Sequence, residues 1–225
     1  MPPAPPARAI APGLAFALVA LALAACGGGG GESTSLALPA GCKEAQTPPP
    51  KHVNLKPPHS RVEPSQRLVA AVDTSCGRFE IALDTKDSPK TVSSFVYLAR
   101  KGIYDDTIFH RILPNFVIQG GDPLGTGTGG PGYSVDEPPP ANVEYRRGTV
   151  AMVKTPAEPP GRSGSQFFVV TAPDAGLPPS YALLGRVISG MRVVDRVGRL
   201  GDAASGETGT PRATVVTRKI AVGGG

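Results

Sequence analysis

The chain has 225 residues, of which 40% are hydrophobic, and this length favours one domain with appendages over two domains. Its 29 glycines and 26 prolines cluster before Arg67 and between Gly120 and Pro140, so they mark linkers and loops within a folded protein. The formal net charge of +5 comes from scattered basic residues. This pattern predicts a solvated surface and argues against nucleic acid as a partner.

The residue types that usually carry chemistry exclude further classes of protein. The three histidines include two in the proline-rich part, and the three cysteines lie far apart. We therefore expect neither a metal site nor a histidine-based catalytic triad. The run Gly125–Gly130 matches a dinucleotide-binding fingerprint, but Pro131 follows where a helix should begin. We interpret the run as a surface loop and expect no cofactor.

The first 26 residues have the pattern of a targeting segment. Arg8 is followed by an apolar stretch, and Leu23-Ala24-Ala25-Cys26 is similar to the bacterial lipobox, whose cysteine receives a diacylglycerol group. An ordinary cleaved signal and a retained membrane helix are the alternatives, and Pro12-Gly13 argues against the helix. We expect a lipoprotein signal peptide over residues 1–26 and lipidation of Cys26. The protein would then be anchored on the extracytoplasmic face of the cell membrane.

Residues 27–65 are interpreted as a tether. Gly27–Gly31 predicts a flexible start, and the prolines at 48–50 and 57–58 predict a semi-rigid, extended continuation. Such a segment would hold the folded domain off the membrane.

From Arg67 onward the pattern changes to that of a folded domain. Alternating and apolar runs predict eight strands, over 67–74, 78–84, 107–112, 116–119, 148–152, 166–170, 182–187 and 213–222. One helix is predicted from Ser88-Pro89 to Gly102 and a second over 191–197. Because strands and helices do not alternate, we predict a mainly β fold: a closed eight-stranded antiparallel barrel with two helices.

Four blocks of sequence carry the functional signal. The run Phe109–Asp122 (FHRILPNFVIQGGD) is followed in order by Gly148–Met152, Gly164–Phe168 and Tyr181–Val187. In these blocks the chain resembles the cyclophilins, a family of peptidyl-prolyl cis-trans isomerases. The resemblance extends from about Leu68 to Val222 and implies an isomerase domain over residues 66–222. Its substrates would be proline-containing segments of exported or envelope proteins, whose folding it would assist.

Arg111 and Gln119 are the candidate catalytic residues. Rotation about an X-Pro bond has a barrier of ~18–20 kcal/mol because the nitrogen lone pair is delocalised into the carbonyl. When the amide twists, electron density returns to the prolyl nitrogen, so a donor directed there stabilises the transition state preferentially. We assign that donor to Arg111, and the resemblance implies that Gln119 orients it. For an isolated arginine, a surface cation stacked on a ring would be the simpler interpretation.

The resemblance also implies which residues bind substrate. The walls of a proline pocket would be Phe116, Val117, Phe168 and Leu177, with Tyr181 at the rim. A groove for the substrate backbone would be lined by Gly127, Val153, Lys154 and Gln166. Because neighbouring strand residues face opposite sides, we expect His110 to face away from Arg111 and to be structural.

The sequence departs from the cyclophilin pattern at a few positions. Val117 stands where many relatives carry methionine, and Lys154 stands where asparagine or arginine is frequent; we expect altered substrate preference with activity retained. The chain has no tryptophan, which argues against sensitivity to cyclosporin. A module that only binds proline segments and an inert envelope barrel are alternative functions, and Arg111 with Gln119 favours the enzyme. We expect a monomer.

Cys42 and Cys76 are the cysteines that remain once Cys26 is assigned to lipid. Outside the cytoplasm, where disulfides persist, we expect the two to pair and to fix the proline-rich segment to the domain. Two free thiols are the alternative, because a sequence does not give the distance between two Cα atoms.

Overall fold

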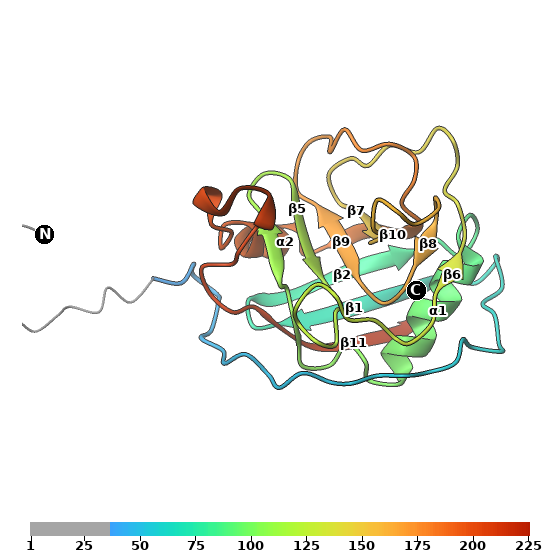
Figure 1. Cartoon of the computed structure of the whole chain (residues 1–225), viewed down its shortest axis with the longest axis horizontal. Helices are drawn as coiled ribbons and strands as arrows, with labels where there is room; N and C mark the ends of the chain where they lie inside the picture. Colours follow the sequence, from blue (N-terminus) through green and yellow to red (C-terminus); the bar gives the residue numbers. More distant parts are fainter. Residues whose placement is uncertain (1–36) are drawn as a thin grey trace, which may run out of the picture. The chain divides into compact units, whose positions relative to one another are not determined.

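A computed structural model describes residues 37–225 (Figure 1). The predicted signal peptide with Cys26, and the glycines at the start of the predicted tether, lie outside the described residues. No helix in the described part of the chain is both long and apolar enough to span a membrane. The described residues belong to one compact unit.

The domain contains eleven strands and three helices in its described residues. The strands are β1 (Leu68–Thr74), β2 (Gly77–Leu83), β3 (Thr107–Ile108), β4 (Arg111–Leu113), β5 (Val117–Gly120), β6 (Val135–Asp136), β7 (Thr149–Met152), β8 (Arg162–Ser163), β9 (Phe167–Val170), β10 (Leu183–Ser189) and β11 (Val216–Gly224). The helices are α1 (Pro89–Arg100), α2 (Met191–Gly198) and a 3₁₀ helix, η1 (Ala203–Thr208).

Nine of the strands form one antiparallel sheet in the order β3-β11-β1-β2-β10-β7-β9-β5-β4. This sheet is an open half-barrel, so the prediction of a closed eight-stranded barrel is wrong. The predicted strand over residues 107–112 is interrupted at Phe109 and His110. Its first half, β3, pairs with β11, and its second half, β4, pairs with β5. One predicted strand therefore supplies both edge strands of the sheet. An isolated bridge joins Ile108 in β3 to Asp122, which follows β5.

The two predicted α-helices are confirmed, and a third helix was not predicted. Pro89 stands at the start of α1, and the predicted core-facing residues Val92, Phe95, Val96 and Ala99 are all buried. The additional helix, η1, has no buried residue, so it lacks the hydrophobic spacing by which a helix is recognised in a sequence. The two-residue strands β6 and β8, which pair with each other, are too short to give an alternating pattern.

Two hydrophobic clusters occupy opposite faces of the sheet around β5, β7 and β9. Ile118, Val150, Phe167 and Val169 belong to the main core, together with residues of α1. Their strand neighbours Val117, Ala151, Phe168 and Val170 belong to a second cluster. This alternation follows from the two-residue period of a strand. The second cluster lies on the face that carries the candidate site.

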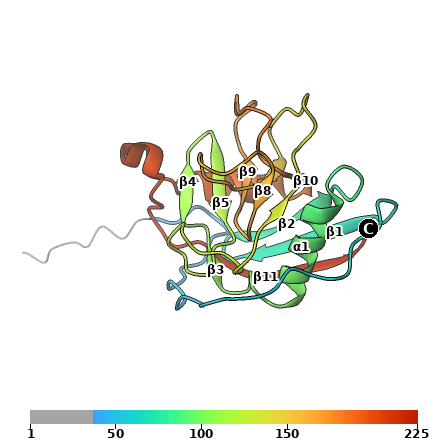
Figure 2. The same ribbon diagram turned by 45° about the vertical axis from the view of Figure 1, so that its right-hand side comes forward.

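Residues 37–65, which we call the strap, pack along the domain (Figures 1 and 2). Leu38, Leu55 and Val62 contact the main core, and the Lys43 N–H donates to Ser75 O at 2.9 Å. Cys42 and Cys76 form the expected disulfide, with their Cα atoms 3.8 Å apart. The predicted tether over 27–65 therefore does not stand free of the domain from residue 37 onward. Its apolar side chains, spaced between the prolines, account for the difference because they bury surface on contact.

Candidate active site

Three neighbouring strands hold the polar centre of the candidate active site. On β4 and β5, Arg111 stands directly opposite Gln119, and on β5 and β9 Gln119 stands opposite Phe168. Gln166 precedes β9 by one residue, so it emerges on the same face as Phe168. The strand register thus brings four of the predicted site residues together from separate sequence blocks.

A chain of hydrogen bonds connects the polar side chains of the site. The Arg111 Nη1 donates to Gln119 Oε1 at 3.3 Å, and Gln119 Nε2 donates to Gln166 Oε1 at 3.0 Å. Gln166 Nε2 in turn donates to the carbonyls of Gly127 and Gly129, at 3.0 and 2.9 Å. Gln119 and Gln166 are only 8% and 9% exposed. Because buried amides need partners, this network fixes both side chains in one orientation.

The guanidinium of Arg111 is fixed from a second direction. Its Nε donates to the backbone carbonyl of Glu207 in η1, at 3.1 Å. The contribution of Glu207 was not predicted, because a backbone carbonyl does not depend on the type of side chain. Arg111 is half-buried and forms no ion pair within residues 37–225. Its charge is therefore directed by neutral acceptors and is not neutralised by a carboxylate.

His110 joins the polar network, which corrects the expectation that it faces away from Arg111. The ring Nε2 of His110 lies 3.2 Å from Gln119 Nε2. Arg111 donates to Oε1, the other end of the same amide. Because the amide Nε2 is a donor, His110 Nε2 is the acceptor and the ring is neutral. Burial is the main cause that lowers the pKa of His110; the Asp122 carboxylate opposes it and Arg111 adds to the lowering. The expected alternation of neighbouring side chains does not apply to His110, because this residue lies in the break between β3 and β4.

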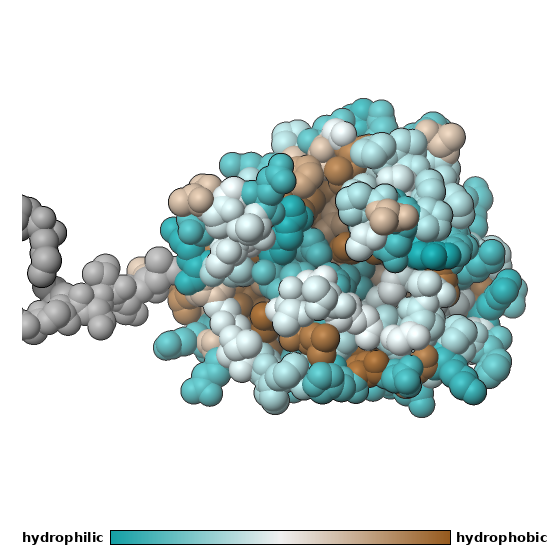
Figure 3. All heavy atoms as spheres, in the orientation of Figure 1, coloured by the Kyte–Doolittle hydropathy of each residue, from teal (hydrophilic) through white to brown (hydrophobic). Residues whose placement is uncertain are grey.

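The second hydrophobic cluster lies beside this network. It contains all five residues predicted for the proline pocket and its rim, together with the groove residue Val153: Val117 and Phe168 are buried, and Phe116, Leu177 and Tyr181 are partly buried. The rings of Phe168 and Tyr181 meet edge to face with centroids 5.5 Å apart. Figure 3 shows hydrophobic side chains gathered in a hollowed area over β5, β9 and β7.

Tyr145 supports this pocket and was not predicted. Its hydroxyl donates to Tyr181 O at 2.6 Å and accepts from Tyr181 N at 3.0 Å. Burial raises the pKa of Tyr145 to about 12, so the hydroxyl keeps its proton at neutral pH. The two residues are 36 positions apart, and Tyr145 belongs to none of the four sequence blocks. No sequence signal connects them.

Two further predicted residues form the rim of the site. Lys154 donates to Thr155 O at 2.9 Å, and its ammonium lies 5.8 Å from the ring centroid of Tyr181. Gly127 has a φ of +88°, which favours glycine, and its amide donates to the buried carboxylate of Asp122 at 2.5 Å. Asp122 also accepts from the amides of Leu124 and Thr126, so it shapes the loop that carries Gly127.

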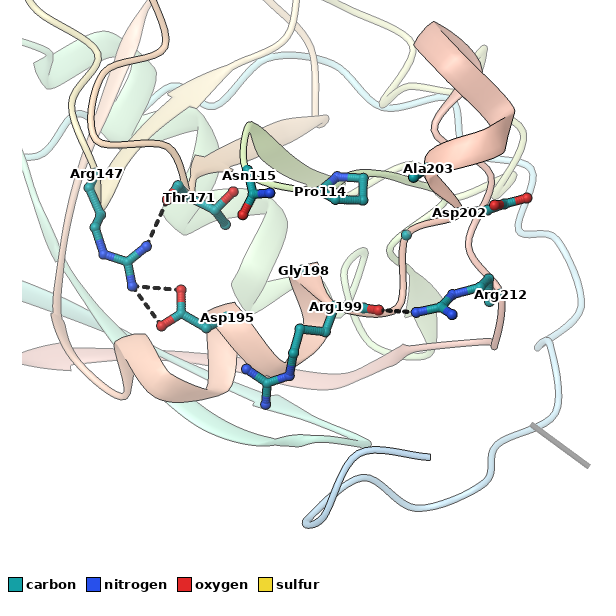
Figure 4. Close-up of a pocket in the computed structure, with 11 residues that line it drawn as sticks. Pro114, Asn115, Arg147, Thr171, Asp195, Gly198, Arg199, Asp202, Ala203 and Arg212 are labelled. Atoms are coloured by element: carbon teal, nitrogen blue, oxygen red, sulfur yellow. Dashed lines mark hydrogen bonds and ion pairs between the residues drawn. The ribbon is translucent and has the colours of Figure 1, made fainter. Parts of the chain in front are cut away.

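A separate hollow of about 710 Å³ lies between the β4–β5 turn, α2 and η1 (Figure 4). None of the predicted site residues lines it. Arg147 crosses its edge, donating to Thr171 O and, at 2.6 Å, to both carboxylate oxygens of Asp195. Because its guanidinium bonds both to Asp195 in α2 and to Thr171 directly after β9, Arg147 connects this helix with the end of that strand. Within residues 37–225 no group of three His, Cys, Asp or Glu side chains is placed to hold a metal.

An antiparallel half-barrel with a directed guanidinium beside an apolar pocket of this kind is the architecture of a cyclophilin-type prolyl isomerase. The model of the family "Cyclophilin type peptidyl-prolyl cis-trans isomerase/CLD" matches residues 69–222. The chain belongs to this family and is a peptidyl-prolyl cis-trans isomerase.

Similar proteins agree with this assignment. Peptidyl-prolyl cis-trans isomerase-like 1 of Aspergillus niger is 41% identical over 129 residues, covering 57% of this chain and 80% of that protein. Peptidyl-prolyl cis-trans isomerase CYP18-2 of Arabidopsis thaliana is 38% identical over 128 residues, covering 56% and 78%. The crystal structure of a Cryptosporidium parvum cyclophilin type isomerase is 30% identical with a TM-score of 0.63, covering 71% of this chain and 99% of that one.

Proposed function

We propose that Arg111 is the catalytic donor of this isomerase and that Gln119 positions it. The observation that carries the proposal is the bond from Arg111 Nη1 to Gln119 Oε1 at the edge of the apolar pocket. In this proposal a proline ring binds in the pocket with its nitrogen directed at the guanidinium. As the X-Pro amide twists, the nitrogen regains its lone pair and accepts a hydrogen bond that the planar amide does not accept. Such a bond stabilises the transition state over the ground state.

No bond in the substrate is broken, so the reaction requires no proton transfer. The neutral state of His110 agrees with a structural role for that ring. Phe116, Val117, Phe168 and Leu177 would exclude water from the twisting amide, and Tyr181 would close the rim. Removing water strengthens the interaction between the guanidinium and the prolyl nitrogen.

The groove beside the pocket is proposed to bind the substrate backbone. Gly127, Val153, Lys154 and Gln166 would line it. A solved structure of the Cryptosporidium parvum isomerase was determined in the presence of the dipeptide Ala-Pro, and it is 29% identical to this chain with a TM-score of 0.62. This likeness supports an Ala-Pro peptide as the test substrate here.

An isomerisation assay with matched arginine variants tests the catalytic proposal. We expect Arg111→Ala to lower kcat/KM for an Ala-Pro peptide by about 10²–10³, the usual effect of one transition-state donor. Arg111→Lys retains the charge but not the planar donor geometry and should recover only part of the rate. The control is Arg186→Ala, an exposed arginine on β10. Wild-type turnover in a folded Arg111→Ala variant would exclude the mechanism, and an inactive wild type would favour a binding-only module.

We further propose that the isomerase is a lipoprotein, anchored through Cys26 to the extracytoplasmic face of the cell membrane, with exported or envelope proteins as clients. Leu23-Ala24-Ala25-Cys26 supports the anchor. The Cys42–Cys76 disulfide supports the compartment, because such bonds persist mainly outside the cytoplasm. A monomer is supported by the surface, since Ile188 is the one large hydrophobic side chain that is exposed within residues 37–225.

Detergent-phase partitioning of the chain expressed in a bacterial host tests the anchor. Wild type should enter the detergent phase, and Cys26→Ala should remain in the aqueous phase or stay unprocessed. Identical partitioning of the two, with no acylated N-terminus by mass spectrometry, would contradict the proposal.

A further inference from the structure

Residues 51–55 of the strap lie against the domain with alternating side chains and two backbone hydrogen bonds. From Lys51 to Leu55 the side chains alternate, with positions 51, 53 and 55 half-buried and positions 52 and 54 exposed. The N–H of Lys51 donates to Pro123 O, and the N–H of Leu55 donates to Pro131 O, both at 2.8 Å.

These two bonds hold the two ends of a single loop, residues 123–131, which we call the glycine loop. Pro123 and Pro131, its first and last residues, are buried. Next to the loop, a Cβ atom placed on Gly132 would lie 2.7 Å from Asn54 Oδ1 and 2.8 Å from Asn54 Cα, so the strap approaches as closely as a glycine allows. Between the two ends a hollow of about 360 Å³ separates the strap from the loop. The strap therefore holds the glycine loop at the two ends of the loop.

The middle of the glycine loop belongs to the candidate active site. Gln166 donates to the carbonyls of Gly127 and Gly129, and the opposite end of its amide accepts from Gln119. Displacing these carbonyls would therefore move the amide that lines the groove. It would also disturb the network that holds Arg111.

We propose that residues 51–55 are a positioning element of this isomerase, which holds the glycine loop in the shape that binds the substrate backbone. This inference rests on the proposed function of Gln166 and Gly127 as groove residues. The strap lies outside the residues that the family model matches. It is thus a feature that this chain adds to the common domain.

The composition of the loop explains why it needs such support. Four of its nine residues are glycine, at 125, 127, 129 and 130. Glycine has the largest conformational freedom of any residue, so an unsupported loop of this composition samples many shapes. Asp122 and Gln166 hold the loop from the inside, and the strap holds it from the outside. Reducing the number of free shapes lowers the entropy lost when the substrate binds.

Lys51 fixes the strap itself. Its ammonium donates to the carbonyls of Gly102, Ile103 and Asp105, in the turn that follows α1. Burial lowers the pKa of Lys51, and the carboxylates of Asp105 and Asp106 oppose the lowering. The position from which the strap reaches Pro123 is therefore set by the turn that follows α1.

The test compares two substitutions at Leu55 in the full chain. Leu55→Pro removes the N–H and replaces the leucine side chain by the small proline ring, whereas Leu55→Ala keeps the N–H and shortens the side chain, so their difference reports chiefly the bond to Pro131. Lys56→Pro adds a proline at the next, exposed position, where the strap donates no backbone hydrogen bond to the domain. The affinity for an Ala-Pro peptide is measured by NMR titration of the labelled protein.

We expect Leu55→Pro to bind the peptide about threefold to tenfold more weakly than Leu55→Ala, the usual range for one lost hydrogen bond. The amide signals of Gly127 and Gly129 should shift in Leu55→Pro, and Lys56→Pro should behave as wild type. Equal affinity and equal loop signals in the two Leu55 variants would overturn the inference. A wild-type chain that binds but does not isomerise the peptide contradicts the proposed catalysis only, because this test reads binding.

If Leu55→Pro does not fold, Lys51→Ala tests the same idea at the other end of the strap, with the exposed Lys56→Ala as its control. Lys51→Ala should weaken peptide binding and shift the signals of Gly127 and Gly129. Unchanged affinity in Lys51→Ala with displaced strap signals would overturn the inference.

Discussion

Arg111 and Gln119 stand opposite each other on β4 and β5, and the amide oxygen of Gln119 accepts a hydrogen bond from the guanidinium over 3.3 Å. The other end of the same amide donates to Gln166 and to His110. The side-chain amide of Gln119 therefore forms three hydrogen bonds, all of them to other residues of the site. This makes Gln119 the residue that connects the proposed catalytic side chain, Arg111, with the proposed substrate groove.

A double-mutant cycle on these two residues should show that they act as one unit. Gln119→Ala should lower kcat/KM by about tenfold or more, because the guanidinium loses its orientation. The double variant Arg111→Ala/Gln119→Ala should be little worse than Arg111→Ala alone. Arg111→Ala combined with the surface change Arg186→Ala provides the additive control. Losses that multiply in the Arg111/Gln119 pair would show that Gln119 does not act through Arg111.

The pairing of these residues was predictable from the sequence, and the reason is the strand register. Residues 111 and 119 flank a tight turn. Phe168 lies on β9, which pairs with β5, and Gln166 directly precedes β9, so period-two alternation places these side chains on one face. The sequence blocks also mark most of the apolar pocket, because Phe116, Val117 and Phe168 lie within them, whereas Leu177 lies in the loop between β9 and β10.

Other parts of the site were not predictable, because they depend on contacts between distant segments. Tyr145 reaches Tyr181 across 36 positions, and Glu207 contributes only a backbone carbonyl. The position of His110 depends on a break between two strands that the apolar pattern does not reveal. The open shape of the sheet has the same origin, since one predicted strand became two edge strands with different partners.

His110 should make the stability of the protein depend on pH in the weakly acidic range. Its pKa is lowered in the fold, so the unfolded chain takes up a proton at a higher pH than the folded protein does. The free energy of unfolding should therefore fall as the pH decreases from about 6.5, the ordinary histidine value, to the lowered pKa. Urea denaturation at pH 7.5 and pH 5.5 measures this fall.

The His110→Gln variant should lose that part of the pH dependence, whereas His59→Gln, a change at an exposed residue of the strap, should retain it. An unchanged pH dependence in His110→Gln would assign the effect to other groups.

Tyr145→Phe should weaken the pocket without removing an aromatic ring. The change leaves the N–H and carbonyl of Tyr181 without the hydroxyl that bonds to both. We expect a loss of about 1–3 kcal/mol in the free energy of unfolding and a higher KM, with kcat less affected. Tyr97→Phe is the control, because the Tyr97 hydroxyl forms no hydrogen bond within residues 37–225. Equal stability of the two variants would remove Tyr145 from the account of the pocket.

Breaking the Cys42–Cys76 bond should destabilise the domain. The bond closes a loop with a sequence separation of 34, for which the chain-entropy model gives ~4 kcal/mol. Urea denaturation with and without reductant should show this loss in wild type, and the double variant Cys42→Ala/Cys76→Ala should not respond to reductant. Two free thiols in oxidised, denatured wild type would contradict the bond.

Arg111 is proposed to stabilise the twisted amide and not the bound proline ring. NMR exchange measurements on an Ala-Pro peptide at saturation separate the two effects, because they give the dissociation constant and the on-enzyme cis-trans rate from the same sample. For Arg111→Ala we expect a dissociation constant within about threefold of wild type and an on-enzyme rate lower by about 10²–10³. A variant that binds the peptide far more weakly but isomerises the bound peptide at the wild-type rate would contradict this proposal.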